Sequence, residues 1–135
     1  MPISVLLADD TSVVRKAIRD LLDSKPEIQV VGEAANFHET VKLIKDLKRN
    51  VVVMDLHMPG ECTVKPRDLK NRLSLDASSL LAISIWNDDE SQALAKRYGA
   101  SRLLDKIGLS ATLVQAVIDL APITVERQLP RSASA

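Results

Sequence analysis

The sequence predicts a single α/β domain in which five parallel strands form a sheet with helices on both faces. The chain has 135 residues, enough for one substantial core and too few for two. Short apolar runs rich in branched residues alternate along it with segments of helical periodicity. Such alternation is typical of right-handed βαβ units, whose strands are buried on both faces of the sheet.

The predicted strands are continuous apolar runs rather than alternating apolar and polar residues. They span residues 3–8, 28–34, 51–54, 80–85 and 102–104. In a parallel sheet of this kind the ligand crevice lies beyond the carboxyl ends of the strands. The residues that directly follow each strand are therefore the candidates for a functional site.

The predicted helices have apolar residues three and four positions apart and are bounded by capping or breaking residues. They span residues 11–24, 36–47, 66–74, 91–98 and 110–121. The expected N-caps are Thr11 or Ser12, Asn36, Asn87 and Ser110, and the expected stops are Pro26, Gly99 and Pro122. Asn36 and Asn87 are each followed three residues later by a glutamate, which is the spacing of a capping box.

Composition excludes several classes of function. Eighteen basic residues balance eighteen acidic ones, so the whole chain carries no electrostatic footprint for nucleic acid. Only three aromatic residues are present, which predicts an aliphatic core and no base-stacking platform. No apolar stretch has the length of a membrane span, and the start of the chain lacks the features of a signal peptide, so we expect a cytoplasmic protein.

Two further features carry no function in this interpretation. Cys62 is the single cysteine, which excludes an internal disulfide, and we expect it to be an ordinary reduced thiol. Residues 1–121 are predicted to form the domain, and residues 122–135, which lack a lasting period and end in small polar residues, are predicted to be a flexible tail or linker stub.

Polar side chains gather after four of the five predicted strands: Asp9, Asp10, Asp55, Ser84 and Lys106. Each aspartate alone has an ordinary explanation as a solvated turn residue. Three carboxylates at one edge of a sheet repel one another, and a hard cation such as Mg²⁺ relieves that repulsion. Because Mg²⁺ commonly bridges protein carboxylates to phosphate, the group predicts phosphoryl chemistry.

The residue types suggest a role for each member of this group. Asp55 would be the nucleophile that becomes an acyl phosphate, and Asp10 and Asp55 would hold Mg²⁺. Asp9 would orient a metal-bound water. Lys106 and the Ser84 hydroxyl would contact oxygens of the phosphoryl group. Without that group, a salt bridge between Lys106 and Asp55 is the simpler expectation.

These residues resemble the receiver domain of bacterial two-component response regulators. The segments LLADD and VVVMDLHMPG, the strand-terminal Ser84 and the lysine of LLDK stand in the family's order over about residues 3–121. SVLLADDTSVVRKAIRDLLDSKPEIQVVGEA is closer still to the NarL/LuxR-type branch. The resemblance implies a flavodoxin-like sheet in the order 2-1-3-4-5, Mg²⁺ dependence and phosphorylation by a sensor histidine kinase. It also implies that the backbone carbonyl of His57 completes the metal shell.

The chain departs from the family pattern at several positions. Leu103 stands where the family has an aromatic residue that swings inward when the hydroxyl of the Ser84 position moves. We therefore expect that the smaller Leu103, or Trp86 in its place, would change conformation when Ser84 moves. Ile107 replaces a frequent proline, and the segment after Met-Pro-Gly predicts an irregular loop and helix. His57 and Trp86 lie two residues after Asp55 and Ser84, where their bulk would slow loss of the phosphoryl group.

Three functions remain open at this stage. The first is a regulatory phosphoacceptor that is not an enzyme beyond slow self-dephosphorylation. The second is a degenerate receiver that acts through protein contacts without phosphorylation. The third is a Mg²⁺-dependent phosphohydrolase, although such enzymes typically have a second acid where this chain has His57.

The resemblance also implies partners. They are a histidine kinase and a second copy of the chain, since receivers commonly pair through their last helices and strand. Residues beyond 121 hold no helix-turn-helix, so we expect either that an output domain was cut away or that this is a stand-alone receiver. DNA and the control of transcription would be reached only through an output domain outside this chain.

Overall fold

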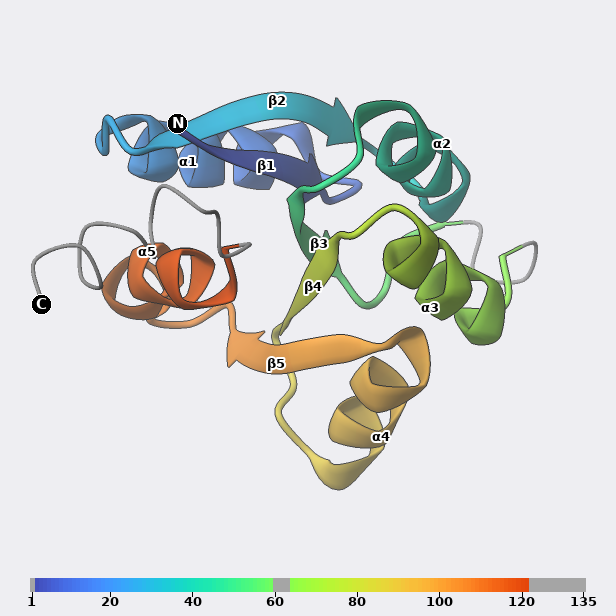
Figure 1. The fold of residues 1–135 in the computed structure, drawn as a ribbon. Coiled ribbons are helices and arrows are strands. Elements are labelled where there is room, and N and C mark those ends of the chain that lie inside the picture. The colour runs from blue at the N-terminus through green and yellow to red at the C-terminus, as the bar shows by residue number, and fades with distance from the viewer. Residues whose placement is uncertain (1, 60–63, 122–135) are drawn as a thin grey trace, which may run out of the picture.

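The structure is a computed structural model, and it describes residues 2–59 and 64–121. Strands and helices alternate in the predicted order (Figure 1). The strands are β1 Ile3–Ala8, β2 Ile28–Ala34, β3 Val51–Asp55, β4 Ser79–Ser84 and β5 Ala100–Asp105. The helices are α1 Ser12–Asp23, α2 Phe37–Leu47, α3 Pro66–Leu75, α4 Asp89–Tyr98 and α5 Leu109–Leu120.

The sheet has the order β2-β1-β3-β4-β5, and every neighbouring pair of strands is parallel. Helices α1 and α5 cover one face, and α2, α3 and α4 cover the other (Figure 1). This confirms the predicted α/β class, the flavodoxin-like order and the burial of both faces. It also makes β3 the central strand, with its carboxyl end in the middle of one sheet edge.

Alternation along β3 divides the core between the two faces. Val52 and Met54 pack under α2, α3 and α4, whereas Val51 and Val53 pack under α1 and α5. All four side chains are buried. Burial of side chains of this size contributes roughly 1.5–3 kcal/mol each, so the apolar runs stabilise the sheet from both sides.

The core is not wholly aliphatic, which corrects the expectation from composition. Phe37, the first residue of α2, and Tyr98, the last residue of α4, are both buried. Their rings stack with centroids 5.3 Å apart and planes 12° apart. Two of the three aromatic residues therefore join the ends of two helices on one face of the sheet.

Some of the predicted helix boundaries are confirmed in atomic detail. The Asn36 side chain accepts a hydrogen bond of 2.8 Å from the backbone N–H of Glu39. The Glu39 carboxylate accepts one of 2.8 Å from the N–H of Ala35, one residue before the cap. Gly99 ends α4 with φ at +87°, a left-handed conformation that favours glycine.

Two predicted caps are wrong, and a third is confirmed only in its position. At α1, Thr11 holds the cap position but its side chain makes no capping bond. At α4 the cap is Asp88 rather than Asn87, and its carboxylate accepts from the N–H of Ser91 at 2.8 Å. That bond lowers the pKa of the Asp88 carboxyl. Helix α5 begins at Leu109 after Gly108, so Ser110 lies inside it.

Two further boundaries differ from expectation. Strand β5 has six residues rather than three, because parallel pairing with β4 extends it from Ala100 to Asp105. Helix α3 is a continuous helix of ten residues that begins with a proline, not the irregular segment that was expected. The Cys62 thiol and the tail 122–135 lie outside the described residues. Within residues 2–59 and 64–121, no helix combines the length and apolar character that crossing a membrane requires.

Candidate functional site

The fold brings the five predicted site residues to one edge of the sheet. Asp55 and Ser84 are the last residues of β3 and β4. Asp9 and Asp10 directly follow β1, and Lys106 directly follows β5. Strand β1 lies between β2 and β3, so the strand order reverses next to β1, and the site is at the carboxyl ends of the strands there.

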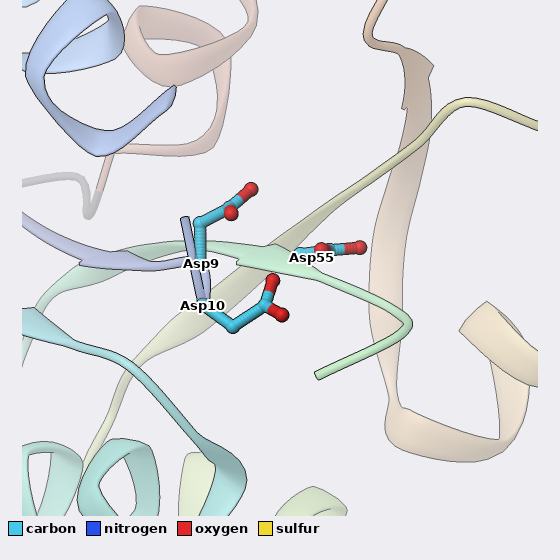
Figure 2. Close-up of side chains that lie close together, drawn as sticks. All are labelled: Asp9, Asp10 and Asp55. Atoms are coloured by element: carbon cyan, nitrogen blue, oxygen red, sulfur yellow. The ribbon is translucent and has the colours of Figure 1, made fainter. Parts of the chain in front are cut away.

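The three aspartates converge beside the end of β3 (Figure 2). Each offers a carboxylate oxygen, and these three oxygens lie within 4.8 Å of one another. Asp9 and Asp55 are buried, and Asp10 is exposed. The cluster therefore has two fixed, desolvated members and one that faces solvent.

Lys106 pairs with both buried carboxylates. Its Nζ lies 2.8 Å from Asp9 Oδ2 and 3.2 Å from Asp55 Oδ2, and it donates a hydrogen bond to the latter. Burial by itself lowers the pKa of the lysine, but the two carboxylates outweigh burial, and the pKa of Lys106 is raised. The expected Lys106–Asp55 salt bridge is present, and Asp9 shares it.

The backbone holds the other oxygen of each buried carboxylate. Asp9 Oδ1 accepts from the N–H of Thr11 at 2.9 Å, and Asp55 Oδ1 accepts from the N–H of His57 at 3.0 Å. Each aspartate thus bonds to the residue two positions ahead, a local turn for which aspartate is well suited. This leaves both Oδ2 atoms facing Lys106.

The ends of β4 and β5 are joined at Ser84. Its buried Oγ accepts from the N–H of Trp86 at 3.0 Å, and its carbonyl accepts from the N–H of Lys106 at 2.9 Å. An accepting hydroxyl keeps its own hydrogen for donation. Ser84 is therefore fixed by its neighbours and retains a donor.

His57 and Trp86 contact each other above the strand ends. Their rings meet edge to face, with centroids 5.1 Å apart and planes 80° apart. His57 is exposed, and Trp86 is 54% exposed. The pair spans the loops that follow β3 and β4.

Leu103 lies away from this group. It is partly buried on β5, packs against the core under α2, α3 and α4, and lines an open groove of about 600 Å³ between α4 and β5. Ile107 is 79% exposed beside Lys106. Neither side chain is among the polar contacts of the site.

The acidic cluster fits a hard divalent cation. All three side chains offer carboxylate oxygen, the ligand type that Mg²⁺ favours. Asp9 Oδ2 is buried and pairs with Lys106 Nζ at 2.8 Å. A buried, charged oxygen in this state is stabilised by a cation. The backbone carbonyl of His57 stays a predicted ligand.

Sequence reasoning missed Arg15 of α1 and Glu33 of β2. Arg15 donates to the backbone carbonyl of Asp9 and to Glu33 Oε1. Glu33 is the one charged residue of β2, and that was the available signal, although its exposed side chain does not require a partner. The sequence contains several arginines, and periodicity alone does not select one.

The raised pKa of Lys106 predicts a loss of stability in alkaline solution. The folded protein holds the lysine proton more tightly than the unfolded chain does. This contribution is complete below the unfolded pKa of about 10.4 and is lost as pH rises through the higher folded value. Urea denaturation between pH 9 and 11 should show a steeper decline for the wild type than for Lys106→Met. If the free energy of unfolding fell equally with pH in the two proteins, the charge of Lys106 would not contribute to stability.

Comparison with known proteins identifies the class. The family model described as the response regulator receiver domain matches residues 5–118. The nitrate/nitrite response regulator NarL of Escherichia coli K12 is 31% identical over 105 residues, which cover 78% of this chain and 48% of NarL. The transcriptional regulatory protein LnrK of Bacillus subtilis is 31% identical over 116 residues, covering 86% of this chain and 52% of LnrK.

A solved receiver-domain structure has the same fold as this chain. The signal receiver domain of the putative response regulator NarL from Mycobacterium tuberculosis superposes with a TM-score of 0.77 at 26% identity, covering 87% of this chain and 94% of that one. The chain belongs to the response regulator receiver domain family. It spans about half the length of the curated relatives NarL and LnrK.

Proposed function

We propose that this chain is a cytoplasmic phosphoacceptor of two-component signalling, in which Asp55 receives a phosphoryl group from a sensor histidine kinase. The observation that carries the proposal is the pairing of Asp55 with Lys106 beside two further carboxylates at the end of the central strand. Membership of the receiver family supports the same assignment.

The transfer would exchange one bond to phosphorus for another. A carboxylate oxygen of Asp55 attacks the phosphorus of a phosphohistidine, and the bond between phosphorus and the imidazole nitrogen breaks. The electron pair returns to that nitrogen. Lys106, 3.2 Å from Asp55 Oδ2, is placed to pair with the transferred phosphoryl oxygens, and the Ser84 hydroxyl is a second donor.

The side chains of Asp9, Asp10 and Asp55, with the His57 carbonyl, would hold Mg²⁺. When bound, the ion neutralises the negative charge that carboxylates and phosphoryl oxygens accumulate at one point. The burial of Asp9 and Asp55 supports this donor set, because the single positive charge of Lys106 offsets only one of two buried negative charges. Asp10 is exposed and stays accessible to solvent.

Phosphorylation would act by shifting a balance between two conformations. Ser84 would follow the phosphoryl group, and Leu103 on the neighbouring strand would repack against α4. NarL and LnrK are named as regulators, LnrK as a transcriptional one, so control of transcription through an output domain outside this sequence is the proposed result. Pairing with a second copy of the chain is part of the same proposal.

The test is incubation with Mg²⁺ and a small phosphodonor, followed by intact mass measurement. We expect a gain of one phosphoryl group in the wild type and none in Asp55→Asn, which keeps the size of the side chain but removes the nucleophilic charge. No gain in the wild type would favour a degenerate receiver that acts through protein contacts. Multiple turnover of phosphate esters would favour a phosphohydrolase.

The contact between His57 and Trp86 predicts control over the lifetime of the aspartyl phosphate. Each truncation, His57→Ala or Trp86→Ala, removes one half of the edge-to-face pair. Opening a path for water should speed phosphoryl loss about two- to tenfold, which corresponds to about 0.4–1.4 kcal/mol of barrier. The decay of the phosphorylated mass gives the rate. Lifetimes equal to that of the wild type would show that the pair does not shield the site.

A further inference from the structure

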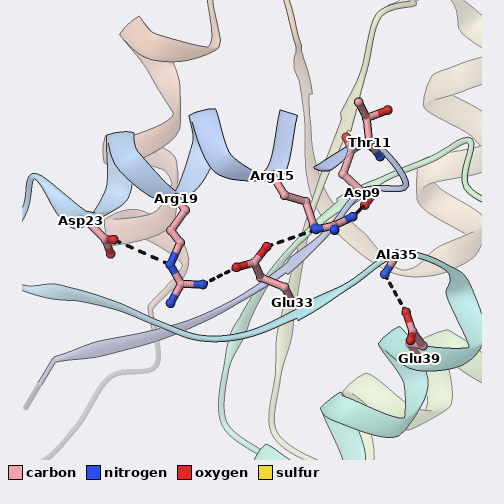
Figure 3. A network of polar contacts seen from close by, with 8 residues as sticks. All are labelled: Asp9, Thr11, Arg15, Arg19, Asp23, Glu33, Ala35 and Glu39. Carbon is pink, nitrogen blue, oxygen red and sulfur yellow. Dashed lines mark hydrogen bonds and ion pairs between the residues drawn. The ribbon is translucent and has the colours of Figure 1, made fainter. Parts of the chain in front are cut away.

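Arg15 joins the acidic loop to strand β2. Its guanidinium donates through Nη1 to the backbone carbonyl of Asp9 and through Nε to Glu33 Oε1 at 3.1 Å (Figure 3). The Arg15 side chain is 19% exposed. One planar side chain therefore bridges the segment that carries two of the three aspartates and the neighbouring strand.

The carbonyl that Arg15 holds belongs to the peptide between Asp9 and Asp10. A peptide unit is planar, so fixing its carbonyl also fixes the direction of the Asp10 N–H and limits the rotations on either side. Those rotations set how the two carboxylates lie relative to each other. Arg15 thus acts on the spacing of the acids without contacting a carboxylate of the cluster.

The same loop is held at two other points. The Asp9 N–H donates to the carbonyl of Ala34 at 3.0 Å, and the Thr11 N–H donates to Asp9 Oδ1 at 2.9 Å. The second bond closes a turn that contains the peptide between Asp9 and Asp10, but neither bond engages the carbonyl of that peptide. The bond from Arg15 restrains that carbonyl.

Glu33 keeps the guanidinium in place. Glu33 Oε2 pairs with Nη1 of Arg19 (Figure 3). Nε of Arg19 in turn lies 3.8 Å from Asp23 Oδ2. Side-chain exposure rises along this series from 19% at Arg15 to 54% at Asp23. Exposed ion pairs contribute little to stability. The contacts of Arg15 with Glu33 and with the Asp9 carbonyl therefore restrain the guanidinium more than the outer pair of Arg19 and Asp23 does.

We propose that Arg15 is a positioning residue for divalent cation binding, and that Glu33 acts through it. This inference rests on the proposed function for the identity of the ion. The proposal predicts that replacing Arg15 weakens cation binding, which is opposite to the electrostatic expectation. Removing a positive charge near a cation site should strengthen cation binding by electrostatics alone, whereas loss of positioning should weaken it.

The experiment compares the Mg²⁺ affinity of the wild type with that of single variants, by calorimetry at constant ionic strength. Arg15→Met, which keeps the stem and removes the donors, should raise the Kd about tenfold, the lower end of the effects seen when groups that orient ligands are removed. Arg15→Lys keeps the charge but not the two-pronged donor, and should also raise it. Glu33→Gln should raise it less. Lys16→Met removes a charge from the same helix and should leave the Kd unchanged, because Lys16 pairs with Asp20.

A lower Kd for Arg15→Met, with no change in Arg15→Lys, would overturn the proposal in favour of simple charge repulsion. Amide hydrogen exchange at residues 10 and 11 in metal-free protein tests the restraint independently of any ion. We expect faster exchange in folded Arg15→Met than in the wild type, and equal exchange would also overturn the proposal. If the wild type binds no Mg²⁺ while the exchange result holds, the proposed function fails and the positioning contact stands.

Discussion

Replacing Lys106 with methionine is expected to destabilise the metal-free protein by about 2–4 kcal/mol at pH 7. The substitution keeps the apolar stem and removes the charge that faces two buried carboxylates. Asp9 and Asp55 are 1% and 6% exposed, so solvent compensates only part of the lost charge. Breaking a buried ion pair by removing one partner is costly because the remaining charge is uncompensated. Residual access of solvent to Lys106, whose side chain is 18% exposed, places the effect below the largest cases.

Urea denaturation measures this loss, and Mg²⁺ extends the test. A cation that binds the folded state stabilises it by RT ln(1 + L/Kd), where L is the free cation concentration, so tighter binding stabilises it more. The variant lacks the amine that competes for the same carboxylates. Mg²⁺ should therefore raise the Tm of Lys106→Met more than that of the wild type. Lys96→Met, at an exposed position in α4, is the matched control and should change stability by less than about 0.5 kcal/mol. Equal stability of Lys106→Met and the wild type would mean that the carboxylates are not held as a charged cluster.

The strand ends were predictable because each one is a local signal. LLADD and VVVMD each show an apolar run that stops at an acid, and the geometry of parallel sheets places such ends together whatever the loops do. The strand order itself came from family resemblance, and the structure confirms it. Strand length was less accessible, since β5 is extended by pairing with β4 rather than by its own composition.

The helix caps show the limit of local patterns. Asn87 and Asp88 are adjacent and both are good capping residues, and each is followed three positions later by a polar residue. The path of the chain after β4 decides between them, and it selects Asp88 with Ser91. A shift of one residue of this kind depends on tertiary packing, which the sequence pattern does not report.

The contacts of Arg15 were inaccessible for a related reason. Arg15 and Glu33 are 18 positions apart and meet because α1 packs against β2. Periodicity correctly places Arg15 on a helix and Glu33 in a strand. Which charged residues of the two elements face each other follows only from the register of the folded layers.

The Phe37–Tyr98 pair was hidden in the same way, and it predicts a large loss of stability. Three aromatic residues in 135 indicate an aliphatic core, but two of them are completely enclosed and stacked. Phe37→Ala should cost about 3–5 kcal/mol, combining lost burial with an unfilled cavity, and the ring contact contributes about 0.5–1.5 kcal/mol of this. For a domain whose total stability is about 5–15 kcal/mol, this is a large fraction.

Phe37→Leu separates the ring contact from the burial. It keeps an apolar side chain at the start of α2 and should cost about 1.5 kcal/mol or less, so the two variants should differ clearly in urea denaturation. Neither ring belongs to the acidic cluster, and the folded fraction of both variants should therefore bind Mg²⁺ with unchanged affinity. A loss below about 1 kcal/mol in Phe37→Ala would mean that α2 and α4 close over the space without the ring. In that case the layer of α2, α3 and α4 would be more adaptable than its buried side chains indicate.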